Sequence, residues 1–217
     1  GLLEEAVVRI AGMTGTPAVK LGRRAVIAMC ADNGVVAQGV TQTGQEVTAI
    51  VTENMSTGDT SVCRMAAAAG AEVIPVDIGV ARPVAGERIR QCNVRRGTAD
   101  MTQGPAMTRE EAVQAVETGI ELVRELKDKG YGLIGTGEMG IGNTTTSSAL
   151  ASVFLNRPPE QVTGRGAGLS SAGLERKIKA IETAIQVNKP NPANPLDVLS
   201  KVAGLDLARL WGVFLGG

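Results

Sequence analysis

Histidine is absent from the 217 residues of this chain. Its absence excludes Ser-His-Asp and Cys-His catalysis and histidine-ligated metal sites within these residues, and we expect no metal here. A general acid or base must therefore be a carboxylate, Lys, Tyr or Cys. Aromatic residues make up only 2% of the chain, which argues against a stacking platform for single-stranded nucleic acid.

The chain also lacks an excess of charge of either sign. Its 22 Lys and Arg residues balance its 22 Asp and Glu residues, and no basic run occurs, so we expect no nucleic-acid partner. The three cysteines are odd in number and show no Cys-x-x-Cys spacing. They predict neither a disulfide framework nor a zinc site, and they favour a cytoplasmic location. No apolar stretch has the length of a membrane span, so we expect no membrane contact.

What is present is an alternation of short apolar runs with helical patterns. Residues 25–30, 72–79 and 131–134 predict buried strands, and helices are expected between them and at 143–155. Residues 81–105 show no periodicity, and the part after 158 predicts helices only. This order predicts an α/β fold with a parallel, Rossmann-like sheet flanked by helices in three layers.

A glycine-rich segment, predicted as a loop over 135–142, lies between the third strand and its helix. Gly135 to Gly140 fit the dinucleotide pattern G-x-G-x-x-G, but residues 154–160 form no second strand ending in an acid, which such a site needs about 20 residues on. A nucleoside-triphosphate loop is also excluded, because Asn143 stands where the lysine belongs. A glycine turn before a helix still suits a phosphate or carboxylate, with Thr144 adding a hydroxyl. A turn that only brings helix and strand together is the alternative.

Other candidates for the same site are a second glycine segment and two acids. Gly166 lies in that segment, which precedes a helical pattern carrying Lys177. The basic side chains of this helix are equally consistent with a phosphate-binding site and with a solvent-exposed basic face. Asp32 and Asp77 each follow a predicted strand at the edge where α/β proteins bind ligands, although capping a loop is the simpler role for either.

Residues 137–146, with the sequence Gly-Glu-Met-Gly-Ile-Gly-Asn-Thr-Thr-Thr, resemble the signature of nicotinate-nucleotide–dimethylbenzimidazole phosphoribosyltransferases. The resemblance covers nearly the whole chain, including residues 32–35, 45–48, 53–55, 76–79, 104–107, 164–177, 188–192 and 212–216. It implies transfer of 5-phosphoribose from nicotinate mononucleotide to 5,6-dimethylbenzimidazole. The products are α-ribazole 5′-phosphate, used for the lower ligand of cobalamin, and nicotinate. It implies no cofactor and a homodimer.

Carried over by position, the resemblance assigns substrate-binding roles to several residues. It implies that Glu138 and Gly140 contact nicotinate, that Gly166 and Lys177 hold the ribose phosphate, and that Thr43 lines the acceptor pocket. Val51 stands at a pocket position that can be Gln in relatives, and Asn33 replaces the family's His, so a related benzimidazole, purine or phenol is also an expected acceptor. The complete predicted binding set is Asp32, Thr43, Val51, Asp77, Glu138, Gly140, Asn143, Thr144, Gly166 and Lys177.

The resemblance also implies two domains. Residues 1–20 would be a helical part of a small second domain that is only partly represented, and residues 21–217 an incomplete large α/β domain. The family's catalytic glutamate lies in a Gly-Glu-Gly motif that would follow Gly217, so we expect poor activity from these residues alone. Two alternatives are a nicotinamide-dependent oxidoreductase using residues 135–140 and a non-catalytic partner of a complete paralogue.

Overall fold

The computed structural model, which describes residues 1–217, is built around a four-stranded sheet. Its strands are β1 (Arg23–Ala31), β2 (Glu72–Gly79), β3 (Arg90–Gln91) and β4 (Tyr131–Met139), in the order β3-β2-β1-β4. All three neighbouring pairs are parallel, so the predicted α/β fold with a parallel sheet is confirmed. β3 lies in the stretch expected to have no regular element, because two residues are too few to show a period.

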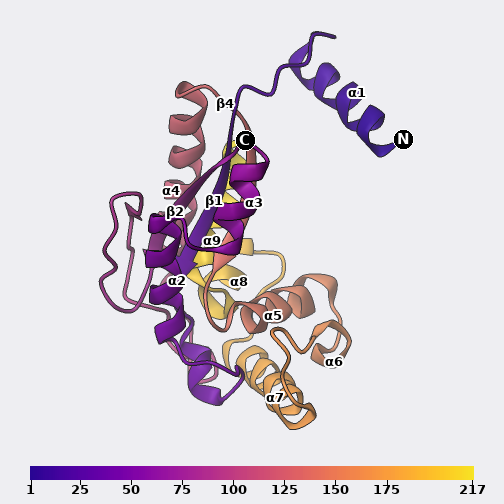
Figure 1. Ribbon diagram of the computed structural model, residues 1–217. Helices are drawn as coiled ribbons and strands as arrows, with labels where there is room; N and C mark the ends of the chain where they lie inside the picture. Colours follow the sequence, from indigo (N-terminus) through magenta and orange to yellow (C-terminus); the bar gives the residue numbers. More distant parts are fainter.

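Helices cover both faces of the sheet (Figure 1). One layer holds α2 (Glu46–Thr57) and α3 (Ser61–Ala68), and the other holds α4 (Arg109–Asp128), α8 (Pro195–Val202) and α9 (Leu205–Gly216). The side chains of β1 alternate between the two layers. Ile27 and Met29 belong to the core beneath α4 and α9, whereas Ala28 and Cys30 belong to the core beneath α2. The period of two therefore fixes which layer each residue meets.

A third group of helices gathers at one end of the sheet (Figure 1). It consists of α5 (Asn143–Leu155), α6 (Pro159–Val162) and α7 (Ser171–Asn188), and the short 3-10 helix η1 (Gly34–Gln38) contacts α7. Parallel strands all end at the same edge, so the turns that follow β1 and β4 meet beside this group.

The start of α4 and its close contact with α9 have local causes. Thr108 begins α4 with a capping box in which its hydroxyl accepts from the Glu111 amide at 3.1 Å. The backbones of α4 and α9 touch because both helices carry glycine at the crossing. A Cβ on Gly119 would lie 2.3 Å from the Arg209 carbonyl oxygen, and one on Gly212 would lie 2.0 Å from that of Val116. Any side chain at either position would push the helices apart.

The predicted glycine loop over 135–142 is wrong in its first half. Gly135 and Gly137 lie inside β4, paired with Val26 and Ala28 of β1. Glycine has a low intrinsic propensity for β-strands, but the hydrogen bonds to β1 outweigh it here. The turn is therefore only Gly140–Gly142, and Gly142 has the positive φ of 94° that favours glycine. Strand residues cannot serve as a dinucleotide-binding loop.

Helix α1 (Leu2–Thr14) stands apart from the sheet and buries none of its residues (Figure 1). Leu2 and Leu3 are 87% and 79% exposed. The division at residue 20 into a small and a large domain stays a prediction. None of the helices has both the length and the apolar character needed to cross a membrane.

Candidate functional site

A pocket of about 200 Å³ lies at the carboxyl end of β4. Its walls come from the loop after η1, the turn between β4 and α5, and the loop before α7. The lining residues are Val40, Thr41, Gln42, Thr43, Met139, Gly140, Ile141, Gly142, Asn143, Thr144, Arg165, Ala167 and Leu169. The structure thus brings four residues of the predicted set, Thr43, Gly140, Asn143 and Thr144, to one hollow.

The start of α5 offers unused donors to this pocket. The amide of Asn143 donates to the Gly140 carbonyl oxygen at 2.9 Å, and that of Thr145 donates to Gly142 at 2.9 Å. The Thr144 amide between them donates to no atom of the chain. The amides of Gly166 and Ala167, in the loop before α7, also have no acceptor. Free amides at a helix N-terminus carry partial positive charge and suit an anion.

Lys177 of α7 is buried against this turn. Its side chain is 1% exposed, and its Nζ donates to Thr144 Oγ1 at 2.7 Å and to the Gly164 carbonyl oxygen at 3.1 Å. No carboxylate forms an ion pair with it, and burial lowers the pKa of this ammonium. A lysine has three protons to donate, and two are used. The Thr144 hydroxyl accepts from Lys177, which leaves its own proton free for another acceptor.

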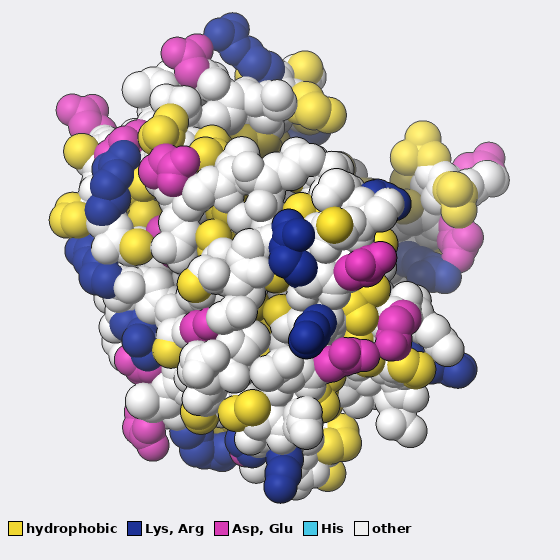
Figure 2. Space-filling model, turned by 90° about the horizontal axis from the view of Figure 1, so that it is seen from below, with side chains coloured by type: hydrophobic (Ala, Val, Ile, Leu, Met, Phe, Trp, Pro, Cys, Tyr) yellow, Lys and Arg dark blue, Asp and Glu magenta, His cyan; other side chains and the backbone are white.

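Gly166 leaves the space in which these groups meet. A Cβ there would lie 2.9 Å from Thr144 Oγ1 and 3.5 Å from Lys177 Nζ, and its φ of +57° also favours glycine. Of the predicted set, Gly166, Lys177 and Thr144 therefore form one cluster. Its attraction for an anion is local, because acidic and basic side chains are interspersed over this end of the molecule without a patch of one sign (Figure 2).

Glu138 and Asn143 are joined at the rim of the pocket. The Asn143 Nδ2 donates to the Glu138 carboxylate, and Glu138 does not itself line the pocket. Loss of solvent around the carboxyl raises the pKa of Glu138, although the bond from Asn143 opposes this shift. Residue 138 is the last but one of β4, so its side chain is carried by the sheet and not by a loop.

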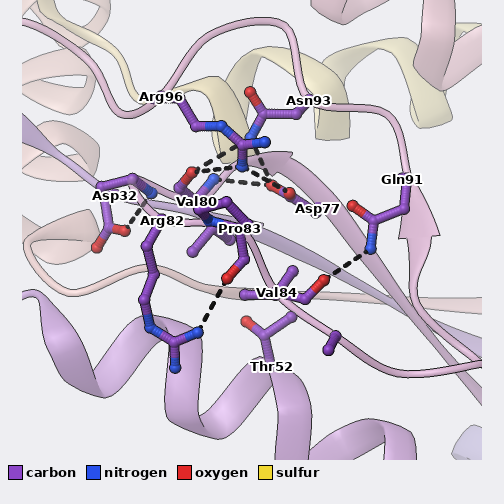
Figure 3. Close-up of polar contacts among 12 residues, drawn as sticks. Asp32, Thr52, Asp77, Val80, Arg82, Pro83, Val84, Gln91, Asn93 and Arg96 are labelled. Carbon is purple, nitrogen blue, oxygen red and sulfur yellow. Dashed lines mark hydrogen bonds and ion pairs between the residues drawn. The ribbon is translucent and has the colours of Figure 1, made fainter.

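Asp32 and Asp77 do not reach the pocket. Asp77 Oδ1 accepts from the Val80 amide and from Asn93 Nδ2, both at 2.8 Å, and Asp32 Oδ2 accepts from the Ala81 amide at 2.8 Å (Figure 3). These donors belong to the loop between β2 and β3 and to the segment after β3. The carboxylates tie this loop to the sheet edge, which is the capping role that the sequence left open. Asp32 Oδ1, however, has no hydrogen-bond partner, and the substrate-binding role of these two acids stays a prediction.

Val51 also lies outside the pocket. It is half-buried on α2 and packs against the smaller core that includes Ala28 and Cys30. Asn33, by contrast, supports the pocket turn from below. Its Nδ2 donates to the Ile141 carbonyl oxygen at 3.3 Å, while the Ile141 amide donates to Thr48 Oγ1 at 3.0 Å. The Ile141 peptide is thereby held on both sides.

A residue that sequence reasoning missed lies directly behind this turn. Asp206, in the first turn of α9, is fully buried, and its Oδ2 has no hydrogen-bond partner. A Cβ on Gly140 would lie 2.7 Å from that oxygen. Burial, and next the charge of Glu138, raise the pKa of Asp206 to about 7. The only signal in the sequence is an acid within the otherwise apolar start of the last helix.

Comparison with known proteins places this geometry in a family. All residues from 1 to 217 match a family described as phosphoribosyltransferase. Two curated relatives are named nicotinate-nucleotide–dimethylbenzimidazole phosphoribosyltransferase. The one from Ruminiclostridium cellulolyticum is 49% identical over 218 residues, and the one from Clostridium acetobutylicum is 48% identical over 216. Each match covers 100% of this chain and 61% of the relative, so the chain spans about three fifths of their length.

Solved structures agree with this match. The crystal structure of CobT from Thermus thermophilus is similar with a TM-score of 0.95 and 40% identity, over 100% of this chain and 65% of that one. A second structure, of the phosphoribosyltransferase from the same organism, has a TM-score of 0.92. Because the match extends over every element that forms the pocket, the chain belongs to the phosphoribosyltransferase family.

Proposed function

We propose that the protein transfers 5-phosphoribose from nicotinate mononucleotide to 5,6-dimethylbenzimidazole or a related base, forming α-ribazole 5′-phosphate for cobalamin lower-ligand synthesis. The observation that carries this proposal is the buried Lys177 ammonium, which has no counter-ion and a proton to spare. Around it lie three amides and one hydroxyl with no acceptor. A buried cation is costly unless paired. A phosphate monoester is the anion that this arrangement of donors fits.

The phosphate would lie between α5 and the loop before α7. Lys177 supplies a charge-assisted hydrogen bond, and Thr144 supplies its amide and its hydroxyl. The amides of Gly166 and Ala167 close the cradle from the opposite side. The helix dipole of α5 adds to the attraction. Together these groups fix one end of the substrate, so that its ribose carbon has a defined place in the pocket.

The reaction needs little beyond this positioning and a base. The bond between the ribose carbon and the pyridinium nitrogen breaks, and its electron pair returns to the ring, which leaves as neutral-ring nicotinate. An acceptor nitrogen forms the new bond to the same carbon. Its ring proton passes to a general base. We assign the nicotinate side to the rim pair Glu138 and Asn143, and the acceptor side to the wall that carries Thr43.

No carboxylate lines the pocket itself. We therefore propose that the general base belongs to the part of the whole protein that these residues do not include. The homodimer, the cytoplasmic location and the absence of a cofactor remain parts of the same proposal. The nicotinamide-dependent oxidoreductase has lost its main support, because Gly135 and Gly137 are strand residues. No observation favours the non-catalytic partner.

The proposal is tested by calorimetric titration of this chain with nicotinate mononucleotide. Lys177→Met removes the ammonium and keeps most of the side-chain volume, so affinity should fall by about 10–100-fold, as expected for a charged hydrogen bond. Lys179→Met is the matched control, because Lys179 lies exposed on the same helix and should bind as the unchanged chain does. Equal affinity of the unchanged chain and Lys177→Met would sink the proposal. Saturation by NAD with no binding of nicotinate mononucleotide would favour the oxidoreductase instead.

A further inference from the structure

We propose that Asp206 is a positioning residue that acts in its protonated, uncharged form. In that form it donates a hydrogen bond to Asn33 and so holds the Gly140–Gly142 turn beneath the phosphate cradle. The inference deepens the proposed function, and its link to substrate affinity rests on it. The geometry of the buried carboxyl is independent of the proposed function.

Two buried oxygens without partners lie together behind the turn. Asp206 and Asn33 are both fully buried, and Asp206 Oδ2 and Asn33 Oδ1 have no donor. Both side chains crowd the same two glycines. A Cβ on Gly204 would lie 2.1 Å from Asp206 Oδ1 and 2.3 Å from Asn33 Oδ1, and one on Gly140 would lie 2.7 Å from Asp206 Oδ2 and 3.1 Å from Asn33 Nδ2. The carboxyl and the amide thus share one small space enclosed by glycine backbone.

The balance of donors and acceptors around Asp206 and Asn33 indicates a proton on the Asp206 carboxyl. The Asn33 side-chain nitrogen has two protons, one of which is donated to the Ile141 carbonyl oxygen at 3.3 Å, whereas Asn33 Oδ1 has no donor. An ionised carboxylate can only accept, so it leaves Asn33 Oδ1 without a donor. Asp206 Oδ1 already accepts from the Leu207 amide at 2.9 Å. A proton on the carboxyl supplies the missing donor and removes the cost of a buried, unpaired charge.

The surrounding charges favour the same form. Burial raises the pKa of Asp206 most and the charge of Glu138 on β4 comes next, and together they outweigh the hydrogen bonds from the Leu207 amide and the Asn33 side chain, which lower it. Cys30 on β1 stays a neutral thiol, because burial raises its pKa to about 12, with the charges of Asp77 on β2 and of Asp206 adding to the shift. Arg209, three residues along α9, is buried but points elsewhere. Its Nη2 donates to the Thr118 carbonyl oxygen at 3.2 Å, and it forms no ion pair with Asp206.

The turn is where this proton has its effect. Asn33 lies directly beneath Gly142, since a Cβ on Gly142 would be 3.1 Å from Asn33 Cβ. Its amide group fixes the Ile141 peptide, and the next residues begin α5 with the free Thr144 amide. When Asp206 loses its proton, its charge repels Asn33 Oδ1 and draws the side-chain amide nitrogen away from Ile141. The turn then loosens, and the amides no longer converge on one phosphate.

The direct test is the titration of Asp206 itself, followed by the ¹³C shift of its side-chain carboxyl in the unliganded chain. The expected midpoint is near 7, where burial and Glu138 place it. Over the same range, exchange of the Ile141 amide should accelerate beyond the intrinsic effect of pH. In Asp206→Asn, which is uncharged and keeps a donor, that extra acceleration should vanish. A midpoint near 4 would overturn the proposal, as would identical exchange profiles of the two proteins.

Stability gives a second measurement. Because its folded pKa is raised from 3.8 to about 7, Asp206 contributes stability that is fully present below about pH 4 and is lost as the pH rises through about 7. Asp206→Asn lacks this loss, so its Tm should gain on that of the unchanged chain between pH 4 and pH 7. Asp128→Asn, an exposed change at the end of α4, is the control and should follow the unchanged chain. A constant difference in Tm would count against the proposal.

Substrate affinity separates this inference from the proposed function. Asp206→Asn should bind nicotinate mononucleotide within about twofold of the unchanged chain at pH 6 and more tightly at pH 8. Asp206→Leu should lose at least tenfold at both. If neither the unchanged chain nor its variants bind nicotinate mononucleotide, but the titration and exchange results are as expected, the proposed function fails and the role of Asp206 holds. If binding is normal but Asp206→Asn changes neither pH profile, the role of Asp206 fails alone.

Discussion

Two regions at the same edge of the sheet use polar residues in opposite ways. Beyond β2, Asp77 and Asp32 accept hydrogen bonds from the loop that follows, and the chain satisfies its own donors (Figure 3). Beyond β4, Lys177 and the start of α5 keep donors that no atom of the chain accepts. A position at a strand end did not by itself bring Asp32 and Asp77 to the pocket. The surplus of buried donors over acceptors around Lys177 is what supports the proposed phosphate site.

The largest effect is expected in the first region, beyond β2, when one of its buried acceptors is removed. Asp77→Ala leaves the Val80 amide and Asn93 without their buried acceptor, so the free energy of unfolding should fall by about 3 kcal/mol. Urea denaturation measures this change, and Asp77→Asn, which keeps one acceptor oxygen, should lose less. Folded Asp77→Ala should bind nicotinate mononucleotide as before. A loss of binding without a loss of stability would instead place Asp77 in the site.

A smaller effect is expected in the second region, beyond β4, where donors remain unpaired. Gly166→Ala places a methyl group 2.9 Å from Thr144 Oγ1 at a φ of +57°. We expect a loss of about 1 kcal/mol in stability from the left-handed backbone and a several-fold loss of affinity for nicotinate mononucleotide. Gly164→Ala is the matched control, because a Cβ there meets nothing within 4 Å. Equal affinities of these two variants in calorimetry would remove Gly166 from the proposed cradle.

The smallest expected effect lies at an ion pair remote from both regions. Arg90 of β3 donates to Glu125 of α4 at 2.7 Å, and chiefly this bond lowers the pKa of Glu125 to about 2. Its contribution is therefore present above about pH 4.5 and is lost as the pH falls toward 2. Glu125→Gln should cost at most about 1 kcal/mol at pH 7, since both side chains are partly exposed. The difference from the unchanged chain, measured by urea denaturation, should vanish near pH 2.

The predictions from sequence succeeded where local signals and packing agree. Residues 72–79 form β2 over the expected span, and residues 143–155 form α5 as expected. Pro75 lies within this strand although proline cannot donate a backbone hydrogen bond, and it fits because β3 pairs only with Val76 and Asp77, which leaves the outer edge of β2 unpaired beside it. The predictions from sequence failed where hydrogen bonds to residues distant in the chain decide the secondary structure. Gly135 and Gly137 have loop propensities, yet hydrogen bonds to β1 keep them in a strand.

The sequence alone determined the α/β order of elements and the family resemblance, because both are recognised from short motifs whose residues lie close together in the chain. Only the tertiary structure decided which polar groups remain unpaired. It brought Lys177 to Thr144 across 33 positions, satisfied Asp77 with Asn93, and buried Asp206 behind Gly140. Hydrogen-bond satisfaction is a property of what surrounds a group in space, so no local pattern contains it.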